Sequence, residues 1–290
     1  MKTIDIHTHG IGGFDTRTAS RKQILKIAEI QMLGGVNEIV PTIYAGDIQT
    51  MRLHMKTIKN SMELQQEARD KFTAQAAIIG VHLEGPFLNP DRCGALNSSA
   101  FIKPSVQAFN ELIEGFEDIV KIITIAPELD GAVDLIRLIT KLGIIVSMGH
   151  SNATYSQAEA GFYAGARGVT HLFNAMASFH HREPGLAGFA LSNKDIYVET
   201  IADPYHLHPK TIELIFTAKP PDKIIIVSDS VKETRTTPVA GAKIADSKNI
   251  LIGGATTIME SARRLIQLGF NEDKIMRCVT ENPARYLSHT

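Results

Sequence analysis

The chain has 290 residues, 44% hydrophobic and 21% charged, so it can bury a large core and does not have a disordered composition. Its 30 basic and 31 acidic residues give a formal net charge of −1, which argues against broad binding to nucleic acid or to a membrane surface. No apolar run approaches ~18 residues and no signal segment opens the sequence, so we expect no membrane span. Cys93 and Cys278 are too few for a disulfide framework and suit a reducing, cytoplasmic setting.

Short runs rich in Val, Ile and Leu alternate with amphipathic stretches along the chain. Several runs, such as residues 78–81 and 224–227, are nearly continuous apolar segments, which is typical of parallel strands covered on both faces. In the first amphipathic stretch, Ile24, Ile27, Ala28 and Leu33 mark the expected buried face of a helix. The predicted strands are residues 3–9, 38–44, 77–84, 120–127, 144–150, 168–174, 197–203 and 223–229.

Eight strands alternating with helices over about 230 residues predict an α/β fold, a (β/α)8 or TIM barrel. A doubly wound open sheet is the alternative, although Gly10, Gly12 and Gly13 do not have the G-x-G-x-x-G spacing of a dinucleotide-binding loop. No internal repeat or linker is evident, so we expect residues 1–290 to form a single catalytic domain. The polar stretch 232–248 predicts a long loop after the eighth strand that could serve as a lid.

Residue types that bind metal ions gather at the predicted carboxyl ends of these strands. They are His7, His9, His82, Glu84, His150, His171 and Asp229. The carboxyl ends of parallel barrel strands open onto one face, and residues i and i+2 of a strand point the same way. A lone histidine there is more often a hydrogen-bonded core group, and an aspartate often caps a helix. Five strands that all end in such residues nevertheless favour a metal site.

Imidazole and carboxylate ligands without thiolate suit a catalytic Zn²⁺ or Fe²⁺ ion, with one or two ions per chain. A divalent ion lowers the pKa of a bound water to about 7, and a nearby carboxylate can take the proton. The pattern therefore predicts metal-assisted hydrolysis of an amide or a related bond.

Four longer segments carry a resemblance to a known family. They are residues 80–90 (GVHLEGPFLNP), 148–154 (MGHSNAT), 170–176 (THLFNAM) and 180–185 (HHREPG), and the segment DIHTHG at residues 5–10 resembles the opening of the amidohydrolase superfamily. Together they resemble the N-acetylglucosamine-6-phosphate deacetylase family, in order and over essentially the whole chain. The resemblance implies a metal-dependent TIM barrel that releases acetate from N-acetylglucosamine 6-phosphate.

The resemblance also implies roles for the metal-binding residues. Glu84, His150 and His171 match the principal ligands, and His7 and His9 match the pair that holds a second ion in members with two. Glu84 would then bridge the ions.

Further matches concern the substrate. The resemblance implies that Asp229 is the acid/base and a ligand, and that His206 contacts the acetamido carbonyl. Asn174, the backbone of Ala175 and Arg182 match the phosphate contacts. In the family this arginine comes from a neighbouring subunit, which implies a homodimer. From the residues alone, Arg182 could instead form a surface ion pair, and His206 could be a solvated loop residue.

The sequence also departs from the family pattern. Leu96 stands where a substrate-contacting histidine is common, and Pro204 replaces a glycine shortly before His206. The flanking segments that build a small β-domain in the family are not found, so we expect the barrel without that domain. Two alternatives stay open: a deacetylase for N-acetylgalactosamine 6-phosphate or another N-acyl substrate, and a sugar-phosphate binding protein with impaired catalysis.

Overall fold

The computed structural model describes residues 1–67, 74–235 and 243–288, and its parallel strands form a barrel wall. In spatial order the strands are β1 (Ile4–Thr8), β4 (Glu38–Tyr44), β6 (Val81–Glu84), β7 (Val120–Ile125), β8 (Ile145–Met148), β9 (Gly168–Val169), β10 (Tyr197–Ile201) and β11 (Ile224–Val227). The wall closes between its first and last strands, where the Asp229 amide donates to the His7 carbonyl at 2.9 Å and Thr8 pairs with Ser230. The predicted (β/α)8 barrel is therefore confirmed, and the open sheet is excluded.

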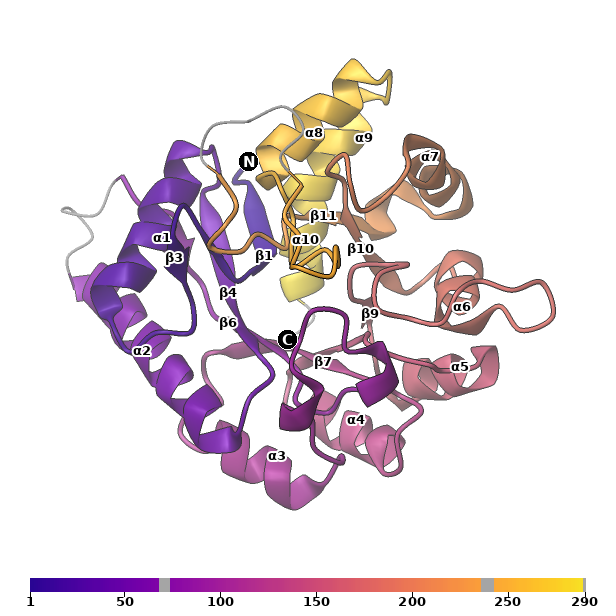
Figure 1. Cartoon of the computed structure of the whole chain (residues 1–290), viewed down its shortest axis with the longest axis horizontal. Coiled ribbons are helices and arrows are strands. Elements are labelled where there is room, and N and C mark those ends of the chain that lie inside the picture. Colours follow the sequence, from indigo (N-terminus) through magenta and orange to yellow (C-terminus); the bar gives the residue numbers. More distant parts are fainter. Residues whose placement is uncertain (68–73, 236–242, 289–290) are drawn as a thin grey trace.

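The helices surround this wall, and their colours follow the chain once around the barrel in Figure 1. They are α1 (Arg21–Leu33), α2 (Ile48–Glu67), α3 (Val106–Ile113), α4 (Ala132–Lys141), α5 (Tyr155–Ala164), α6 (Gly185–Ser192), α7 (Pro209–Ala218), α8 (Ile258–Gln267), α9 (Glu272–Val279) and α10 (Glu281–Leu287). The short elements are strands β2 (Gly10–Ile11), β3 (Phe14–Asp15) and β5 (Ala77–Ile78) and 3₁₀ turns η2 (Pro90–Arg92), η3 (Ser98–Ala100) and η4 (Pro221–Lys223). Within the described ranges, no helix combines the length and apolarity that a bilayer crossing requires.

Apolar side chains form two separate cores. The larger lies between the wall and the helices and includes Ile24 and Ile27 of α1. The smaller fills the inside of the barrel, where Ile6 and Ile122 are fully buried. Leu33, expected on the buried face of α1, is instead 78% exposed, because the buried face runs through Ile24, Ile27, Ala28 and Gln31 and the helical spacing puts Leu33 on the opposite side. The inner core supports the floor of the metal-ligand cluster at the carboxyl end of the barrel.

Helix α10 contributes one aromatic side chain to the inner core. Tyr286 is fully buried, and its ring centroid lies 4.9 Å from that of Tyr197 at the start of β10. Its hydroxyl approaches Gly168 so closely that a Cβ built on this glycine would lie 2.1 Å from the oxygen. The last helix is thereby packed against the barrel interior.

We expect Tyr286→Ala to lower the free energy of unfolding by about 3–5 kcal/mol, because it empties a large site in a packed core. Tyr163→Ala is the matched control, since Tyr163 is 78% exposed and its loss should change stability by less than about 0.5 kcal/mol. Chemical denaturation followed by circular dichroism measures both variants. Equal effects would show that Tyr286 does not anchor α10.

Candidate metal-dependent active site

The predicted ligands converge at the carboxyl end of the barrel. They form two groups, His7 with His9 and Asp229, and Glu84 with His150 and His171, and the ligand atoms within each group lie within 4.8 Å of one another. Five of the six side chains line a cavity of about 240 Å³, and His7 lies directly beneath. The structure therefore brings together side chains that stand up to 222 residues apart in the sequence.

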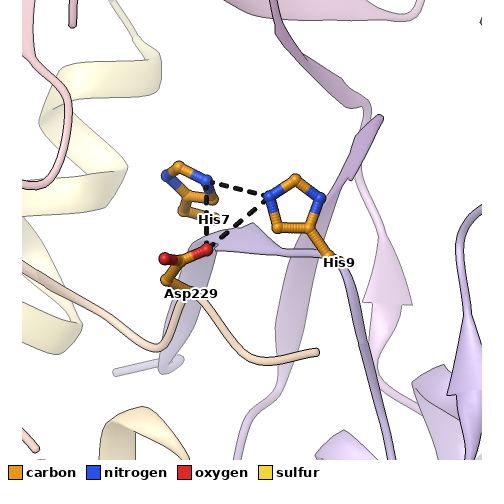
Figure 2. A group of neighbouring side chains, drawn as sticks. All are labelled: His7, His9 and Asp229. Carbon is orange, nitrogen blue, oxygen red and sulfur yellow. Dashed lines mark hydrogen bonds and ion pairs between the residues drawn. The ribbon is translucent and has the colours of Figure 1, made fainter. Parts of the chain in front are cut away.

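The first group joins the two ends of the barrel sheet. Figure 2 shows His7 and His9 at the end of β1 and Asp229 after β11, with their polar atoms turned toward one another. The Nε2 atoms of the two histidines are 3.3 Å apart, and Asp229 Oδ1 lies 3.5 Å from His7 Nε2 and 3.6 Å from His9 Nε2. The expected common direction of His7 and His9 is confirmed.

Glu84, at the end of β6, links the two groups. Its Oε1 lies 3.0 Å from His150 Nε2 and 3.1 Å from His171 Nε2, while its Oε2 lies 3.1 Å from His9 Nε2. His7 Nε2 is 3.5 Å from Oε1. One carboxylate thus faces four imidazoles, which is the position that a bridging ligand requires.

Hydrogen bonds outside the groups fix the orientation of two of the rings. His7 Nδ1 lies 3.0 Å from Glu199 Oε2, and His150 Nδ1 lies 2.8 Å from the carbonyl oxygen of Arg92. Both partners are acceptors, so each ring carries its hydrogen on Nδ1 and turns the lone pair of Nε2 inward. This is the tautomer that a metal ion needs.

The contacts between the imidazoles themselves fit a cation. His150 Nε2 and His171 Nε2 are 3.2 Å apart, and the Nε2 atoms of His7 and His9 are similarly close. Two lone pairs that face each other at this distance repel unless a proton or a metal ion lies between them. Nitrogen and carboxylate oxygen are the donors that Zn²⁺ and Fe²⁺ accept, so the residues present fit a divalent ion.

The pKa shifts of the buried groups also favour a cation at this site. Burial alone would lower the pKa of His7, but Asp229, Glu199 and Glu84 together raise it well above the ordinary value. Burial opposes ionisation of Glu84, yet hydrogen bonds from the surrounding imidazoles hold the pKa of its carboxyl well below the usual range. The pocket therefore favours a positive charge at its centre.

The backbone is strained where it presents three of the ligands. His150, His171 and Asp229 have φ angles of 47°, 31° and 47°, in the left-handed region that side chains other than glycine seldom adopt. Each such residue costs about 1–3 kcal/mol, which the surrounding structure must offset. Such strain concentrates at functional sites.

His206 reaches the cavity from the loop after β10. Its Nδ1 lies 2.9 Å from Oδ2 of Asp203. The Asp203 carboxylate also accepts hydrogen bonds from the backbone amides of Tyr205, His206 and Ala255. Burial opposes the charge on His206, but the Asp203 carboxylate raises its pKa above the ordinary value. The imidazole is therefore held with Nε2 available to a substrate, and it is not a solvated loop residue.

Replacing Asp203 by Asn should lower the pKa of His206 and destabilise the fold by about 1.5–3 kcal/mol, because a charge-assisted hydrogen bond is lost. The raised pKa of His206 gives stability that is complete below about pH 6.5 and is lost as the pH rises through its folded pKa. The lowered pKa of Asp203 gives stability present above about pH 3.9 and lost in acid. The variant should therefore lose most stability between these two pH values. NMR titration and unfolding measured against pH test this, and a pH-independent loss would contradict it.

Two polar residues near the ligands have other partners. His82 Nδ1 lies 3.1 Å from the Ile6 carbonyl and its Nε2 lies 2.9 Å from Thr124 Oγ1, while burial lowers its pKa well below the ordinary value. Glu128 accepts hydrogen bonds from Ser151 Oγ at 2.7 Å and from the Asn152 amide at 2.6 Å. Both residues support the loops that carry ligands.

The residues expected to bind the phosphate lie in two separate places. Asn174 and Ala175 line the cavity, and Asn174 Nδ2 donates to the carbonyl of His171 at 3.2 Å. Leu96 lines the cavity as well. Arg182 lies outside it, exposed on the loop before α6, with one guanidinium nitrogen 3.0 Å from His181 Nε2. The chain alone does not bring Arg182 to the ligands.

Several residues of the site were missed from the sequence. Tyr44 lines the cavity and its ring stacks on His9, with centroids 3.8 Å apart, and Arg17 covers its outer face. Residues 250–253 form part of the wall, just after the expected lid loop. Within that loop, residues 236–242 lie outside the described residues. Tyr44 ends the strand predicted over residues 38–44, and this position was the signal that could have placed it at the site.

Comparison with known proteins agrees with this geometry. The model of the Amidohydrolase family matches residues 2–290. An N-acetylglucosamine-6-phosphate deacetylase of Bacillus subtilis (strain 168) is 33% identical, over 98% of this chain and 74% of its own length. An N-acetylgalactosamine-6-phosphate deacetylase of Escherichia coli O157:H7 is 27% identical, over 98% of this chain and 76% of its own length.

Solved structures show the same similarity. The N-acetylglucosamine-6-phosphate deacetylase from Pasteurella multocida superposes with a TM-score of 0.88 at 27% identity, covering 99% of this chain and 76% of that protein. The N-acetyl-D-glucosamine-6-phosphate deacetylase from Mycobacterium smegmatis superposes with a TM-score of 0.85 at 28% identity, covering 99% of this chain and 78% of that protein. With its barrel, its strand-end ligands and a family match over nearly its whole length, the chain belongs to the amidohydrolase family.

Proposed function

We propose that this protein hydrolyses the acetamido group of N-acetylglucosamine 6-phosphate to give glucosamine 6-phosphate and acetate. The observation that carries the proposal is the convergence of four imidazoles and two carboxylates at the carboxyl end of the barrel, five of these six side chains lining one cavity. The similarity to deacetylases over 98% of the chain supports the choice of substrate. A barrel that only bound the sugar would not need this ligand set.

The side chains divide the chemistry between them. A divalent ion held by the two groups would polarise the acyl carbonyl and lower the pKa of water. Asp229 accepts a proton from the attacking water and passes it to the amine nitrogen as the C–N bond breaks. In its protonated form, which the Asp203 carboxylate favours by raising the pKa of the ring, His206 donates a hydrogen bond from Nε2 to the carbonyl oxygen, where negative charge develops. Asp203 keeps that imidazole in place.

Phosphate recognition is assigned to Asn174, the backbone of Ala175 and Arg182. An arginine fork and backbone amides suit phosphate oxygens. Because Arg182 is exposed and away from the cavity of its own chain, the assignment requires a homodimer in which it reaches the neighbouring site. For the ion we propose Zn²⁺ or Fe²⁺, and for the protein a cytoplasmic location.

Acetate release from a panel of N-acetyl sugars tests the proposal. We expect turnover of N-acetylglucosamine 6-phosphate, and a strongly raised KM when the sugar lacks the phosphate or when Arg182 is replaced by Ala. N-acetylgalactosamine 6-phosphate is the second candidate, because one similar protein acts on that epimer by name. Equal rates with and without the phosphate would refute the assignment of Arg182.

A further inference from the structure

A third carboxylate, Glu199, lies beneath the ligand groups. It belongs to β10 and points into the barrel, where it is 1% exposed, and His7 beside it is fully buried. Its Oε2 lies 3.0 Å from His7 Nδ1. Its Oε1 has no hydrogen-bond partner among the residues that the structure describes. The side-chain hydrogen bond of this buried carboxylate therefore goes to His7.

This contact decides which nitrogen of His7 carries the hydrogen. A carboxylate accepts, so Nδ1 donates to Glu199 and Nε2 presents its lone pair. That lone pair faces His9 Nε2 at 3.3 Å, and carboxylate oxygens of Asp229 and Glu84, each at 3.5 Å. The carboxylates can only accept, so the point where these atoms meet suits a cation.

Glu199 also distinguishes the two ligand groups. In the other group His150 Nδ1 faces the neutral carbonyl of Arg92, and among the residues that the structure describes the Nδ1 atoms of His171 and of His9 have no hydrogen-bond partner. In the described part of the chain, His7 is thus the ligand histidine whose Nδ1 has an anionic partner. An anionic partner makes an imidazole a stronger donor to a metal ion.

We propose that Glu199 is a positioning residue that prepares His7 for a metal ion in the group of His7, His9 and Asp229. In this way it sets the occupancy of that group separately from the group of Glu84, His150 and His171. The inference rests on the metal chemistry of the proposed function, but it concerns metal binding and not the identity of the sugar.

The test measures metal binding without substrate. The metal-stripped wild type is titrated with Zn²⁺ against a coloured chelator, and with Co²⁺ while its visible spectrum is recorded. We expect two equivalents. In Glu199→Leu one of the two ions should bind about 10–100-fold more weakly, with the other unchanged. Glu199→Gln keeps an acceptor without the charge and should fall between.

Thr200→Val is the matched control. Thr200 follows Glu199 on β10 and is fully buried, and its hydroxyl has no hydrogen-bond partner in the described ranges, so this nearly isosteric change should leave both affinities unaltered. The proposal is overturned if the wild type takes up one equivalent only, if the Glu199 variants bind both ions as the wild type does, or if both ions weaken together. Since no sugar is present, absence of deacetylation would count against the proposed function and leave this result intact.

Discussion

Asp229→Asn should lower the turnover of N-acetylglucosamine 6-phosphate by about 10²–10⁴-fold, because the amide cannot accept the proton of the attacking water. Asn keeps the size of the side chain and one oxygen that can face His7 and His9, where Asp229 Oδ1 now lies at 3.5 and 3.6 Å. We therefore expect the variant to retain metal. Acetate release and elemental analysis of the same sample separate catalysis from binding.

Asp222→Asn is the control for this variant. Asp222 is exposed in η4, just before β11, at the opposite end of the strand that leads to Asp229. It should keep full turnover. Near-native turnover in Asp229→Asn would refute its role as the acid/base. Loss of the metal together with loss of turnover would show that Asp229 acts chiefly as a ligand.

Glu84→Gln should reduce activity to the level of the metal-stripped protein. Its carboxylate lies within 3.1 Å of the Nε2 atoms of three histidines, His9, His150 and His171, so its replacement affects both ligand groups at once. Removing a direct ligand should weaken metal affinity by more than the roughly 10–100-fold typical of an outer partner. We expect the purified Glu84→Gln variant to be folded but to contain little metal.

Glu128→Gln provides the comparison. Glu128 is also close to the site, but it bonds to Asn89, Ser151 and Asn152 and to none of the ligands. It should keep its metal content even if its stability falls. Full metal content in Glu84→Gln would mean that the ions are bound elsewhere.

Much of the barrel could be predicted because its strands are apolar on both faces and its helices have one apolar face. The ends of the strands were harder to place. The strand predicted over residues 168–174 is β9, which ends at Val169, and the chain then turns to present His171 at a φ of 31°. A residue pattern does not record such a turn, because its backbone is held by contacts with other strands, such as the hydrogen bond from the Leu172 amide to the Glu199 carbonyl on β10.

The candidate ligands could be predicted from residue type and strand-end position, whereas the residues that support them could not. Glu199 stands between Val198 and Thr200 in a short strand whose residue pattern does not mark an inward-facing acid, and only the closed barrel shows that it faces His7. Tyr44 and Leu96 depend in the same way on loops and strands that meet across the cavity. The phosphate contact proposed for Arg182 requires the proposed homodimer.

Metal-dependent hydrolysis at this cavity is tested by a metal titration of the stripped protein during acetate release from N-acetylglucosamine 6-phosphate. We expect no acetate before metal is added and a rate that rises in step with the ions bound, until the two ligand groups are filled. Full activity without metal, or a folded, metal-loaded protein that releases no acetate from this sugar, would contradict the proposed chemistry.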